Sequence, residues 1–383
     1  MSRGYIGNEA PAKISDRKGI VTIQEDYTWL RNNPRGILEG TWNNIWNRIS
    51  QIPRKTPNPV MTTFDGGCNL SGTNKWAGGV LAANGKIYGI PATASGVLCI
   101  DPSTKSVSIF GNLDTTAWKY IGGAVALNGM IYAASFHAPY TFLKINPYTE
   151  SISPCVSTSG TAKYYGAVLA TNGMIYIPPN AATSVGKINP NNDSFTSFGY
   201  FSGTWRSGCL APNSCIYYIP GGATNCLKVD PSNDSGSTFG SLPSTIDKNE
   251  AGVLAQTGKI YGAPAQIDQF ERITPNDNTI NLIGSVSGST YRYKGGILAP
   301  DGNLYFIPGS YSHLISMNPF TEEITDHGEA PGWVSGAWAG AVLAPNGNIY
   351  CIPQSASCVL EISNVGTMDW NTSALLTPYV NKF

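Results

Sequence analysis

The chain has 383 residues and a formal net charge of zero, and charged residues make up 13% of it, about half the usual share of roughly 25%. A neutral chain has no overall field to draw it to nucleic acid or to an anionic membrane, and 42% apolar residues are too many for a disordered chain. Because no apolar run is long enough to span a membrane and 1–8 is too polar for a secretion signal, we expect a soluble chain with no membrane insertion and no nucleic-acid partner.

The first predicted elements lie in an N-terminal arm, residues 1–59, which carries short helices and extended segments. Thr22 and Glu25 form a capping box, and Pro34 closes the helix that follows. A second short helix is indicated by an apolar stripe at helical spacing, formed by Trp42, Ile45, Trp46 and Ile49. The stripe either packs on the protein's own surface or docks a partner or a second copy of the chain, and its two tryptophans favour docking.

The rest of the chain is built on a repeat. An Ile/Leu-Tyr dipeptide recurs seven times, with its tyrosines 41–45 residues apart. In the first copy, strand-like runs occupy 78–82, 86–91, 96–100 and 106–111, and Asn84–Gly85 supplies a hairpin turn between the first two. Four short antiparallel strands in about 44 residues are typical of a propeller blade. The sequence therefore predicts an all-β fold, a seven-bladed β-propeller over residues 60–383.

The end of the propeller needs a strand from its beginning. The last copy supplies strands at 340–344, 348–353 and 359–363 but no clean fourth strand. Residues 60–66 resemble the fourth-strand run 106–111 of the first copy. Because an open ring would expose two sheet edges, we expect residues 60–66 to complete the seventh blade.

Cysteine and histidine spacing argues against a metal site or another cofactor. The eight cysteines form no CxxC pair, and the three histidines are scattered, whereas zinc ligands come in closely spaced pairs. Most cysteines lie in apolar strand patterns, so we expect buried free thiols. Cys351 and Cys358, which flank one hairpin, are the best candidates for a bridge.

Two repeat positions before each first strand are candidates for a binding ring at the mouth of the central channel. The position two residues before the strand's glycine is occupied by Trp76, Tyr120, Tyr164, Trp205, Asn249, Tyr293 and Trp338. The preceding position is basic in five copies, at Lys75, Lys119, Lys163, Lys248 and Arg292. Either the aromatic rings fill the wedge between blades while the cations reach for water, or both sets face an acidic glycan.

Parts of the chain resemble known proteins. The arm's 4–7 and 19–27, together with Trp29, resemble the N-terminal segment of many tailed-phage tail proteins. Residues 344–353 are similar to a propeller repeat written GxVLAPNGxIYxIP, and the ending 378–383 is similar to the close of such chains. The resemblance implies a virion structural protein, assembled in the host cytoplasm. Its arm would bind other tail proteins, with a homo-oligomer as one arrangement, and its propeller would bind host-surface glycan or protein.

The acids and histidines do not form a recognisable catalytic set. Glu250 is the lone acid beside the predicted ring, Asp268 is the only acid in the variable loops, and His137 and His313 fall in blades that are not adjacent. A glycosidase needs two facing carboxylates. We therefore expect a non-catalytic virion adhesin or adaptor. A cellular scaffold for protein–protein contacts and a propeller hydrolase of the lactonase or glycosidase type are the alternatives.

Overall fold

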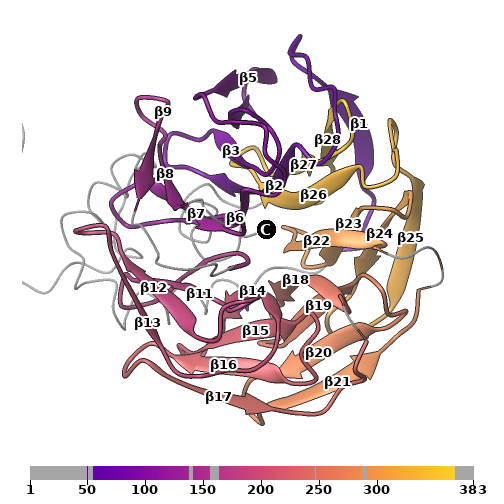
Figure 1. Ribbon diagram of the computed structural model, residues 1–383. Helices are drawn as coiled ribbons and strands as arrows, with labels where there is room; N and C mark the ends of the chain where they lie inside the picture. Colours follow the sequence, from indigo (N-terminus) through magenta and orange to yellow (C-terminus); the bar gives the residue numbers. More distant parts are fainter. Residues whose placement is uncertain are drawn as a thin grey trace, which may run out of the picture.

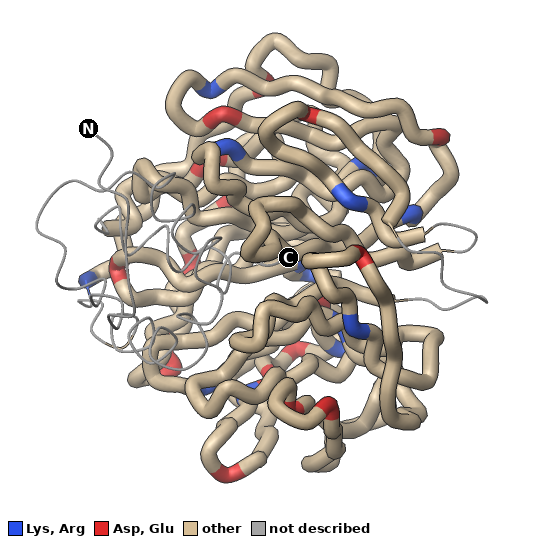
Figure 2. The backbone as a smooth tube through the Cα atoms, turned by 90° about the vertical axis from the view of Figure 1, so that its left-hand side faces the viewer, with Lys and Arg blue, Asp and Glu red and all other residues tan. Residues whose placement is uncertain are grey.

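The computed structural model describes residues 50, 55–137, 141–155, 164–245, 247–286, 288 and 291–366. The arm elements named above, from 4–7 through the capping box and Pro34 to the stripe of Trp42, Ile45, Trp46 and Ile49, lie outside the described residues, as do Lys163 and the ending 378–383. No helix in the described ranges is long and apolar enough to cross a membrane. Acidic and basic positions are interspersed over the described backbone (Figure 2).

Seven four-stranded antiparallel sheets surround a common axis, which confirms the predicted propeller (Figure 1). The innermost strands, which number the blades one to seven, are β2 (Trp76–Leu81), β6 (Tyr120–Val125), β10 (Val168–Leu169), β14 (Trp205–Leu210), β18 (Asn249–Leu254), β22 (Tyr293–Leu298) and β26 (Trp338–Leu343). The second strands are β3 (Ile87–Pro91), β7 (Ile131–Ser135), β11 (Ile175–Ile177), β15 (Ile216–Pro220), β19 (Ile260–Pro264), β23 (Leu304–Pro308) and β27 (Ile349–Pro353).

The outer half of each blade is less buried than the inner half. The third strands are β4 (Val97–Asp101), β8 (Phe142–Asn146), β12 (Val185–Asn189), β16 (Cys226–Asp230), β20 (Phe270–Thr274), β24 (His313–Met317) and β28 (Val359–Ser363). The outermost strands are β5 (Ser106–Phe110), β9 (Ser151–Cys155), β13 (Ser194–Phe198), β17 (Ser235–Phe239), β21 (Thr279–Ile283), β25 (Ile324–Glu329) and β1 (Val60–Phe64). Burial falls outward, from a fully buried β2 to a largely exposed β5.

Glycines on the inner strands allow the blades to approach one another. A Cβ added to Gly79 would lie 2.6 Å from the side chain of Ile352 in blade seven, and one added to Gly252 would lie 2.6 Å from Ile219 in blade four. These distances are far below van der Waals contact. The small residues of the repeat therefore reflect the limited room around the axis.

The ring closes between the two ends of the described chain. Strand β1 pairs antiparallel with β28, with Val60 opposite Ser363 and Phe64 opposite Val359. Just before β1, the Lys55 backbone N–H donates a 2.9 Å hydrogen bond to Asp301 O of blade six. The segment from Lys55 to Phe64 thus completes blade seven and also holds the neighbouring blade.

The tyrosine of the repeated dipeptide ties each blade to the next. In blade two, the Tyr132 hydroxyl donates a 2.6 Å hydrogen bond to Asp193 Oδ1, and Asn128 Nδ2 donates a 2.7 Å bond to Pro190 O, both acceptors lying in blade three. We call this contact the inter-blade latch. Six blades form the latch, and in each of them the tyrosine hydroxyl donates a hydrogen bond to the following blade: Tyr88, Tyr132, Tyr176, Tyr217, Tyr261 and Tyr350.

All eight cysteines are free thiols, and six of them are buried. The bridge considered between Cys351 and Cys358 is not formed. In the portion of the chain that the structure describes, no group of three or more His, Cys, Asp or Glu side chains is arranged to hold a metal ion.

The latch makes a measurable contribution to stability. Tyr132→Phe removes the hydrogen bond to Asp193 Oδ1, while Lys144 still pairs with Oδ2 of the same carboxylate, so we expect a loss of about 1 kcal/mol in the free energy of unfolding. Tyr200→Phe is the control, because Tyr200 is 78% exposed. Chemical denaturation of both variants measures the difference, and equal stabilities would contradict a structural role for the latch.

Removal of the closing strand tests the ring itself. Deletion of residues 1–67 removes β1 and exposes the edge of β28, so we expect cooperative thermal unfolding to be lost. Addition of a synthetic peptide that spans residues 58–67 should restore it. A truncated protein that melts at the same temperature as the full chain would show that β1 is dispensable.

Candidate functional site

The aromatic side chains of the predicted ring are buried rather than presented at the channel mouth. The indole N–H groups of Trp76, Trp205 and Trp338 donate hydrogen bonds of 2.8–3.0 Å to backbone carbonyls just before the third strands of their own blades. The other aromatic members of the predicted ring are at most 3% exposed: Tyr120, Tyr164 and Tyr293. These side chains fill the blades, so the prediction that they form an exposed ring is corrected.

The basic side chains of the predicted ring are buried too. The Lys75 ammonium donates to three backbone carbonyls, including Gly72 O at 2.8 Å and Ala356 O at 3.0 Å, and burial lowers the pKa of Lys75 to about 8. The other described members, Lys119, Lys248 and Arg292, likewise donate to backbone carbonyls. These cations hold loops in place, which corrects the expectation that they would face a ligand.

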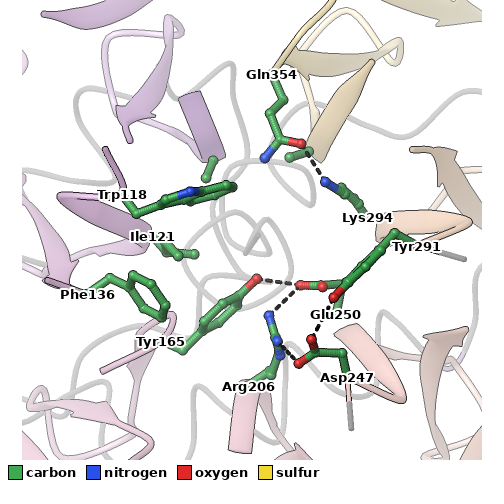
Figure 3. Close-up of a pocket in the computed structure, with 12 residues that line it drawn as sticks. Trp118, Ile121, Phe136, Tyr165, Arg206, Asp247, Glu250, Tyr291, Lys294 and Gln354 are labelled. Carbon is green, nitrogen blue, oxygen red and sulfur yellow. Dashed lines mark hydrogen bonds and ion pairs between the residues drawn. The ribbon is translucent and has the colours of Figure 1, made fainter. Parts of the chain in front are cut away.

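The axial cavity is lined instead by the next residue of each repeat. A cavity of about 370 Å³ lies where the seven innermost strands converge. Each blade contributes the residue that follows the buried aromatic position: Ala77, Ile121, Tyr165, Arg206, Glu250, Lys294 and Ala339 (Figure 3). Since every blade supplies one wall residue, the cavity lies on the propeller axis.

A β-bulge explains why this position faces the axis. Trp76 pairs with Pro91 and Gly79 pairs with Gly89, so three steps along β2 match two steps along β3. The same shift occurs in blades two, four, five, six and seven. An extra residue turns the local side chain away from the regular alternation. The bulge therefore directs Ala77 and its counterparts into the cavity.

Loops above the strands supply the remaining wall. Trp118, Asp247 and Tyr291 occupy equivalent loop positions and line the cavity, and all three have positive φ angles of 53–58°. Large residues seldom adopt this left-handed conformation, and where they do it commonly marks a functional site. Phe136 and Gln354 follow second strands and complete the lining.

The wall divides into an apolar half and a polar half. On the side of blades one, two and seven lie Trp118, Ile121 and Phe136 with two alanines. On the side of blades three to six lie the hydrogen-bonding groups: Tyr165, Arg206, Asp247, Glu250, Tyr291 and Lys294. No histidine is among the described residues that line the cavity.

A continuous hydrogen-bond network spans the polar half. Tyr165 Oη donates to Glu250 Oε2 at 2.5 Å, and Arg206 Nη1 donates to the same oxygen at 2.8 Å. Arg206 also forms an ion pair with Asp247, which accepts a 2.8 Å hydrogen bond from the Tyr291 hydroxyl. Four blades thus share one network, which holds the side chains in fixed positions before any ligand arrives.

The network sets the charge of each group. Burial and the Glu250 carboxylate raise the pKa of Tyr165 well above its usual range, so the phenol stays protonated. Burial alone would lower the pKa of Arg206, but the neighbouring Glu250 carboxylate more than offsets it and the net pKa is raised. Burial lowers the pKa of Lys294, and Glu250 opposes this effect.

Lys294 lies apart from the ion pairs of the network. Its ammonium donates a 2.7 Å hydrogen bond to Gln354 Oε1 and makes no ion pair among the described residues. Arg206, in contrast, is balanced by two carboxylates. Lys294 therefore carries the positive charge that remains for a ligand.

Sequence reasoning missed these wall residues by one position, although a signal was present. Across the seven copies, the buried position is aromatic in six, whereas the next position holds Ala, Ile, Tyr, Arg, Glu, Lys and Ala. A position that serves packing is uniform in a repeat. Within the innermost strand, the position that varies in both charge and size is the one that faces the cavity.

Comparison with known proteins identifies the fold. The sequence matches no family model and no curated protein. Among solved structures, a catalytically inactive virginiamycin B lyase from Staphylococcus aureus, determined with quinupristin, is similar with a TM-score of 0.67 and 12% identity, over 80% of this chain and 99% of that chain. A streptogramin B lyase gives a TM-score of 0.65 and 13% identity, over 80% and 98%.

A protein of another kind shares the same fold. The extracellular domain of a putative hybrid two-component system from B. thetaiotaomicron gives a TM-score of 0.60 and 12% identity, over 79% of this chain and 41% of that chain. Identities this low establish the propeller fold alone. Proteins of unrelated function therefore share this architecture.

The lyases overturn our expectation that the chain is not an enzyme. That expectation was based on scattered histidines and on acids that form no recognised pair. Enzymes with the same fold stand among the most similar structures. The cavity also brings Tyr165, Arg206 and Glu250 into direct contact, which the sequence did not predict. The exclusion of catalysis was therefore wrong.

The contribution of the buried ion pair at the cavity to protein stability can be measured. Glu250→Ala leaves Arg206 with one carboxylate and Tyr165 without its acceptor, so we expect a loss of about 3 kcal/mol in the free energy of unfolding. Lys86→Ala is the matched control, because both side chains of its ion pair with Glu150 are over a third exposed and such a pair is worth less than about 1 kcal/mol. Urea denaturation compares the two, and similar losses would contradict a tightly coupled network.

Proposed function

We propose that this chain is a receptor-binding protein of a tailed-phage particle, whose axial cavity receives the end of an acidic host-surface glycan. The half-apolar, half-charged wall of that cavity is the observation that carries the proposal. The resemblance of 4–7 and 19–27 to phage tail proteins supports the virion location. In this proposal the arm, 1–59, binds other tail proteins.

The apolar half of the cavity suits one face of a sugar ring. Trp118 and Phe136 present flat aromatic surfaces, against which the C–H groups of a sugar pack favourably. The Phe136 ring lies 5.9 Å from the Tyr165 ring in an edge-to-face arrangement, which fixes its orientation. Such rings give contact area and shape selection without requiring a charge on the ligand.

The polar half suits the hydroxyl and acidic groups of the same ligand. Lys294 stands across the cavity from Trp118, and Gln354 of blade seven reaches it from the side (Figure 3). An ammonium without an ion-pair partner attracts a carboxylate or phosphate, most strongly where burial limits screening by water. The acidic group of the ligand therefore lies at Lys294 while the sugar face lies on Trp118.

The position of the cavity favours a chain end. Each of the seven blades contributes to its wall, so the cavity is bounded on all sides around the axis. A terminal residue enters along the axis with the rest of the glycan outside. We therefore propose recognition of a terminal acidic sugar.

Binding variants test the glycan site. On an array of oligosaccharides ending in uronic or sialic acids, we expect Trp118→Ala and Lys294→Met each to weaken binding about tenfold. Binding by the unaltered chain should also fall as salt is added. Lys228→Met, which changes a lysine outside the cavity, should bind as the unaltered protein does. Equal affinities for all three variants would reject the axial site.

A separate experiment tests the virion location. The full chain and a variant without residues 1–59 are mixed with purified particles that lack the protein, then sedimented. We expect only the full chain to sediment with the particles. If neither binds, the assignment fails and the cellular scaffold becomes the better explanation.

A second candidate function is catalysis in the same cavity. The observation that favours it is the 2.5 Å contact between the Tyr165 hydroxyl and Glu250 beside Arg206, since phenols and carboxylates can transfer protons in enzymes. Incubation of each bound oligosaccharide with the protein, followed by mass spectrometry, detects cleavage. Tyr165→Phe should then abolish turnover but retain binding, and intact oligosaccharides would reject this candidate.

A further inference from the structure

Blade five departs from the repeat at two positions that face each other. Where six blades have an aromatic residue at the start of the innermost strand, blade five has Asn249. Where five blades have leucine as the second residue of the third strand, blade five has Glu271. Two apolar positions have thus been replaced by polar ones in a single blade.

The two polar side chains meet inside the protein. Glu271 lies opposite Gly262 in the strand register. A Cβ added to Gly262 would lie 3.1 Å from Asn249 Cγ and 3.2 Å from Glu271 Cβ. Both side chains have zero exposure. Asn249 and Glu271 therefore lie together in the buried interior of blade five.

Four polar atoms of this pair have no hydrogen-bond partner of good geometry among the described residues. They are both carboxylate oxygens of Glu271 and both amide atoms of Asn249. Buried polar atoms are nearly always paired, and an unpaired buried charge is far more costly than an unpaired neutral group. The neutral, protonated form of Glu271 is the one that this buried interior favours.

The titratable groups that face Glu271 do not neutralise it. They are Lys248 on the segment before β18 and Cys226 on β16 of blade four. The Lys248 ammonium donates to Thr245 O at 2.8 Å, and the Cys226 thiol donates to Tyr218 O at 3.3 Å. Burial raises the pKa of Glu271 to about 8, although Lys248 and then Asn249 lower it.

This buried pair is connected to the axial cavity through the backbone. Asn249 points into the blade, while its neighbour Glu250 and nearby Asp247 line the cavity. Lys248, which donates to Thr245 O, holds the same short segment that presents two acids to Arg206. A change of charge on Glu271 therefore occurs beside a residue whose immediate neighbour, Glu250, lines the cavity.

We propose that Glu271 and Asn249 form an internal proton-binding site, and that loss of its proton loosens the start of β18 and with it the acidic wall of the axial cavity. Only the consequence for ligand binding rests on the proposed function. The proton site itself depends on the burial of these two residues alone.

The direction of the pH dependence follows from the two states. In the unfolded chain Glu271 ionises near pH 4.5, and in the folded chain it keeps its proton up to about pH 8. Between these values the folded state binds one more proton than the unfolded state. The equilibrium constant for folding therefore falls as pH rises, by up to about tenfold for each pH unit. This decrease ends above pH 8, where Glu271 is ionised in both states.

Stability measurements across this range test the proton site. We expect the free energy of unfolding of the unaltered protein to fall between pH 5 and 8. In Glu271→Gln this fall should be smaller, and the difference should equal the contribution of the one proton that Glu271 binds. The double variant Asn249→Tyr with Glu271→Leu, which restores the residues of blade six, should show the same reduced slope and a higher midpoint. Glu322→Gln is the control: since the folded-state pKa of Glu322 is lowered, its effect appears at acidic pH.

Hydrogen exchange tests the link to the cavity without a ligand. At pH 8.5 we expect the amides of β18 to exchange about tenfold faster in the unaltered protein than in Glu271→Gln. The amides of β2 serve as the internal reference and should not differ. Equal pH slopes for the two proteins would overturn the proton site. Equal exchange of β18 with unequal slopes would overturn its coupling to the cavity.

Discussion

The latch between neighbouring blades is the contact on which the closed ring depends. A blade of four short strands cannot bury its apolar faces alone, so each must be held against two neighbours. The tyrosine of one blade reaches the turn between the third and fourth strands of the next, and Tyr350 carries the pattern from blade seven back to blade one through Pro102 O. Lys105 and Glu361 add a 2.6 Å ion pair at this junction. The contact between blades six and seven differs, because the Tyr305 hydroxyl donates to Asp301 within blade six. Here the Lys55 backbone N–H, just before β1, donates to Asp301 O instead.

The latch and the cavity use opposite ends of the same strands. Tyr88 lies near the turn that follows Leu81, whereas Ala77 lies at the start of β2, beside the axis. Left-handed backbone occurs at both ends: Trp118, Asp247 and Tyr291 adopt it beside the cavity, and Asp193 and Glu322 adopt it in turns that accept hydrogen bonds from latch tyrosines.

The repeat made the fold predictable, because its period counts the blades and its Asn-Gly pairs mark the hairpins. The site was less predictable. A bulge is not visible in a single sequence, and the shift of one residue between Trp76 and Ala77 exchanges buried and axial positions. The network of Tyr165, Arg206 and Glu250 depends on contacts between blades, which no local pattern reports. The unusual residues Asn249 and Glu271 are visible in the repeat, but their contact becomes evident only when the strands are paired.

The bulge also has a consequence for how such a protein can change over time. Because every blade donates one wall residue from the same repeat position, recombination between repeats in the gene would exchange these residues one at a time. Each exchange would carry its own latch tyrosine and turn with it, so the circle would remain intact. A new combination around the axis could thus arise from shuffled copies already present in the chain, without the selection of individual point changes.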